Sequence, residues 1–251
     1  MKLKYMYKQV LLAVVLIGFL SACNNEAVKS DLYYIMLDKT DTTQNYKHLL
    51  KSSRAEILEL SELTLEGSSP NGCSVRTFEI NSLSNNKSDE VELEKGSIGL
   101  SGDNSLDRNE EIKKFYKELD RLFSDLATPS KSFSQSKIYQ NLCRELVSLR
   151  EAEGYNSKRL IIYSDMLENS DLFSFYKSKI DYTDEESLRL TIESIEKQAC
   201  VFPELSGIEV FVISSRNETN DEMINNAERF WMYLLDSKGA KNIHFNSELK
   251  L

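Results

Sequence analysis

Three continuous apolar runs of strand length recur along the chain, at Leu32–Leu37, Arg159–Ser164 and Ile208–Ser214. Runs without polar alternation are typical of strands buried on both faces, as in a parallel sheet that helices cover on each side. We therefore predict that these three segments are parallel and adjacent in the middle of one sheet.

Shorter or more polar segments predict the rest of the sheet. Val75–Ile80 has the composition of a further strand, and Val91–Leu100 is expected to pair with it as a polar edge strand. Asn242–Phe245 is expected to be a short last strand. The polar stretch Asn81–Glu90 is expected to be a surface loop.

Helical spacing of apolar residues fills the intervals between the predicted strands. Asp107–Leu126 and Ser136–Ala152 each place their apolar residues on one stripe, and an earlier helix is expected from about Tyr46 to Leu63. Capping boxes at Thr183–Glu186 and Thr219–Glu222 predict two more helix starts.

The last of these helices is expected to end near Gly239, with Trp231 in the core. Alternating strands and helices predict an α/β fold: a three-layer α/β/α sandwich around a central, mostly parallel sheet. Ligands of such sheets bind outside the carboxyl ends of the strands, which is where Asp38 and Asp165 fall.

The first residues have the organisation of an export signal. Lys2, Lys4 and Lys8 precede an apolar stretch too short to span a bilayer comfortably, and Leu-Ser-Ala-Cys ends at Cys23. This segment resembles a bacterial lipobox, which implies that 1–22 is a cleaved signal peptide and that Cys23 carries acyl chains. We predict a tether over 23–30, one domain over 31–251, and an extracytoplasmic protein anchored to the cell envelope.

The charge balance argues against a nucleic-acid partner. The chain has 31 Lys plus Arg against 40 Asp plus Glu, for a formal net charge of −9. Loss of the three lysines in the predicted signal peptide makes the mature protein more acidic still. A polyanion would be repelled by such a chain.

Few residues are available for thiol, zinc or nucleotide chemistry. Beyond Cys23 the chain has Cys73, Cys143 and Cys200, and we expect the last two to be small buried residues on helices rather than a disulfide. With two histidines and no CxxC, a His/Cys zinc site is not expected. The chain also lacks GxSxG, GxGxxG and GxxxxGK[ST] patterns.

The stretch after the first predicted strand carries the main chemical signal. Asp38-Lys-Thr40-Asp-Thr42 places a carboxylate at the strand end with hydroxyls two and four residues later. Hard oxygen ligands of this kind suit Mg²⁺. An aspartate at a strand end is also the position of a phosphoryl-accepting nucleophile.

The pattern Asp-x-Thr-x-Thr resembles the metal-ion-dependent adhesion site of von Willebrand factor A domains, whose motif is Asp-x-Ser-x-Ser. The family also supplies a hydroxyl before a mid-domain helix and an aspartate after the next strand, positions that Ser136 and Asp165 occupy here. The order of predicted elements over Asp31–Leu251 is similar too. The resemblance implies that Asp38, Thr40, Thr42, Ser136 and Asp165 hold Mg²⁺, partly through water.

An A-type domain of this kind implies a binding or adhesion module, in which Mg²⁺ bridges to a carboxylate of a protein partner. The metal then serves binding without a chemical step, so we do not predict an enzyme. A lipid anchor would add the membrane as a second contact.

The alternative is a phosphatase or phosphotransferase. Asp-Lys-Thr-Asp-Thr differs by one residue from the phosphorylation motif of P-type ATPases, members of the haloacid dehalogenase superfamily, and this resemblance makes Asp38 the nucleophile. Thr40 stands where soluble relatives have the acid/base Asp. Ser164 fits the second motif of that superfamily. Its fourth motif needs acidic residues directly after a later strand to hold Mg²⁺, and none stands at the end of Ile208–Ser214.

A purely structural interpretation also fits these residues. Thr40 or Thr42 could cap the following helix, and Asp165 could close a local turn. Lys39 is expected to be solvated. The apolar residues of Met166–Lys177 are expected to pack on the core rather than form a contact patch.

Overall fold

The computed structural model describes residues 28–40, 46–64, 69–82, 88–96, 105–128, 135–177, 179–214 and 221–249. The predicted signal peptide, Cys23, Thr42 and the helix start at Thr219 lie outside these ranges. None of the helices in the described ranges combines the length and apolarity that crossing a bilayer requires.

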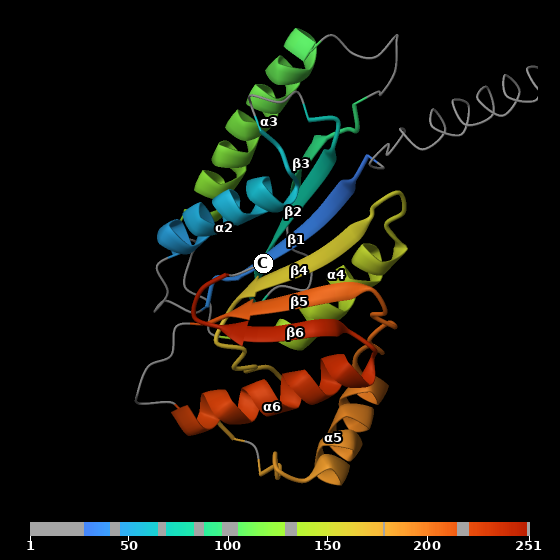
Figure 1. The fold of residues 1–251 in the computed structure, drawn as a ribbon. Coiled ribbons are helices and arrows are strands. Elements are labelled where there is room, and N and C mark those ends of the chain that lie inside the picture. The colour runs from blue at the N-terminus through green and yellow to red at the C-terminus, as the bar shows by residue number, and fades with distance from the viewer. Residues whose placement is uncertain are drawn as a thin grey trace, which may run out of the picture.

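Within the described ranges, six strands form one sheet in the order β3-β2-β1-β4-β5-β6 (Figure 1). All neighbouring strands are parallel except β2 and β3, which are antiparallel. The three continuous apolar runs are β1, β4 and β5, which lie side by side away from the edges, so that prediction is confirmed. The strands are β1 (Ser30–Asp38), β2 (Gly72–Ile80), β3 (Ser88–Leu93), β4 (Ser157–Tyr163), β5 (Ile208–Ile213) and β6 (Lys241–Asn246).

Five helices cover the two faces of the sheet in the described part of the chain. They are α2 (Tyr46–Leu60), α3 (Ser105–Leu126), α4 (Ile138–Glu151), α5 (Glu185–Gln198) and α6 (Asp221–Ser237). The element order and the single antiparallel edge pair agree with the arrangement that the A-domain resemblance implies. The predicted three-layer α/β/α sandwich is therefore confirmed.

The side chains of β1 alternate between two hydrophobic cores. Tyr33, Ile35 and Leu37 pack with residues of α2 and α3 on one face. Leu32 and its alternate neighbours pack with α4, α5 and α6 on the other face, which Figure 1 shows as the second helical layer. Because both faces are covered, every position of β1 is buried, and this explains the lack of polar alternation.

Trp231 of α6 is fully buried, as predicted, and its Nε1 donates to the carbonyl oxygen of Met166 at 2.8 Å. The loop that begins at Met166 packs on the same helix, because the rings of Phe173 and Phe175 lie 5.0 and 5.8 Å from that of Phe230. The expectation that this loop packs on the core is confirmed for these two aromatic residues.

Two sequence expectations about helix ends and cysteines are wrong. The N-cap of α5 is Asp184, whose carboxylate accepts a hydrogen bond from Ser187 N. The predicted capping box has Thr183 as the N-cap, so the helix begins one residue later than predicted. Cys143 and Cys200 form a disulfide, with a Cα–Cα distance of 6.6 Å. Cys200 lies beyond the end of α5, where the chain returns to α4, and this return brings the two thiols together. Cys73 is free and buried.

Candidate functional site at the carboxyl end of the sheet

Asp38 is the last residue of β1, and its side chain is buried between the ends of neighbouring strands with 1% exposure. Its Oδ1 accepts hydrogen bonds from Thr40 N at 2.9 Å and Thr40 Oγ1 at 2.6 Å. Its Oδ2 accepts from Ser136 Oγ at 3.1 Å and Ser164 Oγ at 2.8 Å. Four donors match the acceptor capacity of one carboxylate.

Three segments far apart in the sequence supply these donors. Ser164 follows β4, the parallel neighbour of β1, so both strands end at the same edge of the sheet. Ser136 precedes α4, and its carbonyl oxygen accepts from Asn169 N at 3.0 Å. That bond ties the segment before α4 to the loop after β4, which fixes the Ser136 hydroxyl against Asp38.

The acid-base properties of Asp38 follow from its burial. Loss of hydration raises the pKa of its carboxyl, and the hydrogen bonds from Thr40, Ser164 and Ser136 partly oppose that rise. Among the described residues no cation forms an ion pair with Asp38. A cation bound here would favour the ionised form of this carboxyl group, because no described cation pairs with it.

A second buried carboxyl group, Glu168, was not identified from the sequence. Its Oε2 accepts from Tyr139 N at 2.7 Å, in the first turn of α4, while Oε1 has no hydrogen-bond partner among the described residues. Burial raises the pKa of Glu168 to about 7, and the nearby charge of Asp38 adds to the rise. Glu168, in the loop after β4, and Asp38, at the end of β1, are thus two buried carboxyl groups that affect each other electrostatically.

Lys39 is not solvated, contrary to the expectation from the sequence. It is 8% exposed, and its Nζ donates to the carbonyl oxygens of Thr128, at 2.8 Å, and Leu126. Glu79 lies 3.7 Å from the same nitrogen. The ammonium group thus caps the carboxyl end of α3, where helix carbonyls lack intrahelical partners. It is directed at that helix rather than at Asp38.

The structure brings together three of the five predicted metal-site residues, namely Asp38, Thr40 and Ser136, and it adds Ser164. Asp165 lies in the turn after β4, where its Oδ1 accepts from Leu167 N at 2.9 Å, as the turn interpretation expects. Thr42 lies outside the described residues.

The donor set is compatible with a hard cation. Each hydroxyl that donates its proton to Asp38 keeps its oxygen lone pairs for a metal, and a carboxylate behind hydroxyl ligands is a common way to orient them. The oxygens of Thr40, Ser136 and Ser164 are of the type that Mg²⁺ prefers. The described residues contain no group of three or more His, Cys, Asp or Glu that could hold a metal ion. Any site here depends on hydroxyls and water.

No protein-family model matches the chain, and no curated protein matches its sequence. Solved structures similar to it include the pilus adhesin SpaC of Lactobacillus rhamnosus GG in an open conformation, at 12% identity and a TM-score of 0.42, over 89% of this chain and 28% of that chain. Proximal thread matrix protein 1 of the mussel byssus aligns at 12% identity and a TM-score of 0.36, over 88% and 42%. The human COPII-coat protein Sec24c aligns at 15% identity and a TM-score of 0.41, over 90% of this chain and 31% of that chain.

The chain thus spans less than half the length of each of these proteins. The similarity is too low to carry an argument about function. The fold assignment therefore rests on the sheet order and the two helical layers.

Proposed function

We propose that this chain is a lipid-anchored, extracytoplasmic binding module whose Asp38 site holds Mg²⁺ and, through it, a carboxylate of a protein partner. The observation that carries the proposal is the convergence of Thr40, Ser136 and Ser164 on the buried carboxylate of Asp38. Mg²⁺ in this role keeps several waters and takes few protein oxygens, which suits a site with hydroxyls and one carboxylate.

In the proposed site Asp38 orients and polarises the hydroxyls, and Thr40, Ser136 and Thr42 act as oxygen ligands. Asp165 takes part through water. A coordination position left to solvent receives the partner's carboxylate, so binding requires no chemical step. The disulfide between Cys143 and Cys200 supports a place outside the cytoplasm, because disulfides persist in oxidising compartments.

Mg²⁺ is expected to stabilise the wild-type protein but not the Asp38→Asn variant. At ten times its dissociation constant, an ion that binds only the folded state adds about 1.4 kcal/mol. That corresponds to a rise of about 3–6 °C in the melting temperature of a domain of this size. Thermal unfolding is followed by circular dichroism in MgCl₂ at constant ionic strength.

Asp171→Asn is the matched control, since Asp171 is exposed in the loop after β4. It should keep the full Mg²⁺ response. An equal response in wild type and Asp38→Asn, or none in wild type, contradicts the proposed metal site. Asp38→Asn retains one acceptor oxygen for Thr40, so the variant is the mildest that removes the charge.

The same proteins test the phosphotransfer alternative, which the hydrogen bond from Ser164 to Asp38 favours because it matches the second motif of that superfamily. We expect no Mg²⁺-dependent hydrolysis of a generic phosphate ester above background. Hydrolysis that is present in wild type and lost in Asp38→Asn would replace the binding proposal by a phosphatase.

Anchoring through Cys23 is tested separately. In a bacterial host that processes lipoproteins, the wild-type chain is expected in the membrane fraction with acyl chains on Cys23. Cys23→Ala should shift the protein out of that fraction and remove the acyl mass. Fractionation with intact-mass analysis measures both. An unchanged membrane fraction and mass for Cys23→Ala would rule out the lipid anchor.

A further inference from the structure

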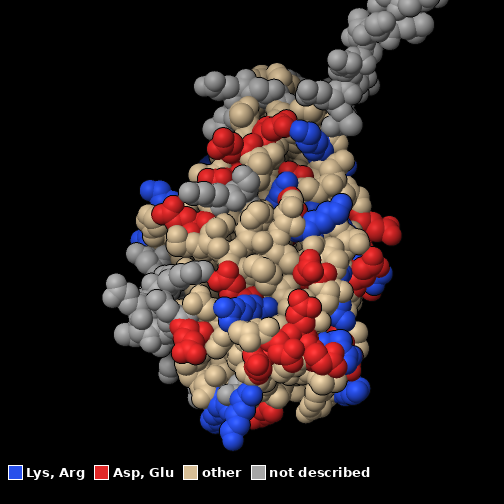
Figure 2. Space-filling view, turned by 60° about the horizontal axis from the view of Figure 1, so that its bottom comes forward, with Lys and Arg blue, Asp and Glu red and all other residues tan. Residues whose placement is uncertain are grey.

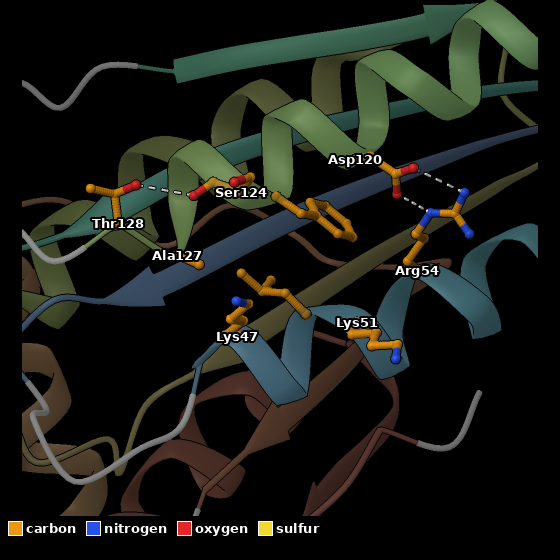
Figure 3. A pocket seen from close by; sticks show the side chains of 9 residues that line it. Lys47, Lys51, Arg54, Asp120, Ser124, Ala127 and Thr128 are labelled. Carbon is orange, nitrogen blue, oxygen red and sulfur yellow. Dashed lines mark hydrogen bonds and ion pairs between the residues drawn. The ribbon is translucent and has the colours of Figure 1, made fainter.

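A groove of about 430 Å³ runs between α2 and α3 (Figure 3). Lys47, Lys51 and Arg54 lie along its α2 side. They are spaced by four and three residues, which places them on one face of the helix. Leu50 and Phe123 line it too, and they are 2% and 6% exposed. The groove therefore combines a basic wall with an apolar floor.

Two of the three basic side chains of this wall form no ion pair within the described part of the chain. Lys47 and Lys51 are exposed and form no ion pair with a described residue. Arg54 forms an ion pair with Asp120 of α3 across the groove, as the dashed lines of Figure 3 show, and it stacks over the ring of Tyr116 at 5.2 Å. Arg54 is thus held in place by Asp120, while no described acidic residue pairs with either lysine.

This grouping stands out in an acidic chain. On the face shown in Figure 2, acidic and basic side chains are interspersed. The groove instead places three cations in a row, in a protein whose formal net charge is −9. A ligand attracted to these side chains carries negative charge.

We propose that the groove binds an acidic, partly apolar segment of a partner protein, as a second contact that does not use the Asp38 site. The seven residue steps from Lys47 to Arg54 span about 10 Å of helix. An extended peptide covers that span in about three residues, so acidic residues alternating with apolar ones match the wall and the floor. A hollow with a buried floor suits an inserted side chain better than a flat bilayer surface.

The position of the groove links it to the strand ends. Thr128 lies at one end of it, on the side where β1 ends in Figure 3. The carbonyl oxygen of Thr128 accepts from Lys39, the residue after Asp38. One partner could therefore reach both sites, but the groove needs no metal, and this difference separates the two proposals experimentally.

The probe is a fluorescein-labelled peptide with the core Glu-Leu-Glu-Leu-Glu between Gly-Ser flanks, measured by fluorescence anisotropy in EDTA. Wild type and Asp38→Asn are expected to bind it equally. The double variant Lys47→Glu, Lys51→Glu should weaken binding by about tenfold or more, because two attractions become repulsions. Binding should also weaken with added salt.

Two further variants test whether the peptide binds in the groove. Lys177→Glu, Lys179→Glu makes the same change in net charge at exposed positions before α5, and it should bind like wild type. Ser124→Trp should weaken binding by filling the groove at an exposed position of α3 without a change of charge. An equal loss in both lysine variants, or full binding by Ser124→Trp, contradicts the groove. Lysine-dependent binding to vesicles of phosphatidylglycerol, with none to the peptide, would make it a membrane contact and overturn the proposal.

Discussion

Replacing both Cys143 and Cys200 by serine is expected to lower the free energy of unfolding by about 4 kcal/mol in the chain-entropy treatment of disulfides. The reason is the sequence separation of 57 residues, because a cross-link over a long loop removes many conformations from the unfolded chain. A domain of this size should then melt about 8–16 °C lower. Urea unfolding of the oxidised wild type and of the double variant measures the difference.

Cys73→Ser is the control for the loss of a thiol without loss of a cross-link, since Cys73 is buried and free. A reducing agent should destabilise wild type and Cys73→Ser but leave the double variant unchanged. A thiol count on the unfolded, unreduced Cys23→Ser chain should give one reactive group. A count of three would show that the disulfide is absent.

Glu168→Gln is expected to stabilise the protein at alkaline pH and to have little effect near pH 4.5. Burial raises the pKa of this carboxyl from 4.5 to about 7, so the folded state holds its proton more tightly than the unfolded state does. The contribution of Glu168 is therefore most favourable below pH 4.5, falls as the pH rises from 4.5 to 7, and stays low above 7. The pKa difference corresponds to about 3 kcal/mol as an upper value.

The measurement is the free energy of unfolding in EDTA from pH 4.5 to 8.5, taken as the difference between variant and wild type so that other titrations cancel. Glu59→Gln is the control, since Glu59 is exposed on α2. Its difference from wild type should stay flat. A flat difference for Glu168→Gln as well would show that the folded protein does not hold Glu168 protonated.

The fold could be predicted from the sequence because a strand that is buried on both faces appears as a continuous apolar run. Every side chain from Leu32 to Leu37 is fully buried, and these side chains belong alternately to the two hydrophobic cores. The strand ends then fix where Asp38 and Ser164 must lie, since parallel neighbours end at the same edge. Ser136 was placed by its resemblance to a family position, and the hydrogen bond to Asp38 confirms that the two side chains meet.

Residues that bind backbone atoms could not be found in this way. Lys39 contacts carbonyl oxygens 87 and 89 positions away, and Glu168 contacts a backbone N–H 29 positions away. Any residue type can supply those backbone groups, so no pattern of side chains marks the contact. Because Lys39 sits in a polar stretch, the sequence predicts a solvated side chain, although the residue caps a helix.

The disulfide illustrates a similar limit for tertiary distances. Three thiols in the predicted mature domain allow several pairings, and the sequence does not say which helix ends meet. Cys143 is buried in α4, while Cys200 follows α5 at a place set by the return of the chain toward β5. Only the packing of α4 against that returning segment selects the pair.

The most direct test of the metal-dependent binding module is a crystal structure of the protein soaked in Mn²⁺, which substitutes for Mg²⁺ at oxygen sites and gives an anomalous signal. We expect one strong anomalous peak beside Asp38, within coordination distance of the Thr40 and Ser136 hydroxyl oxygens, and we expect EDTA to remove it. A map without a peak at Asp38, in which the same hydroxyls remain bonded to the carboxylate, would contradict this expectation.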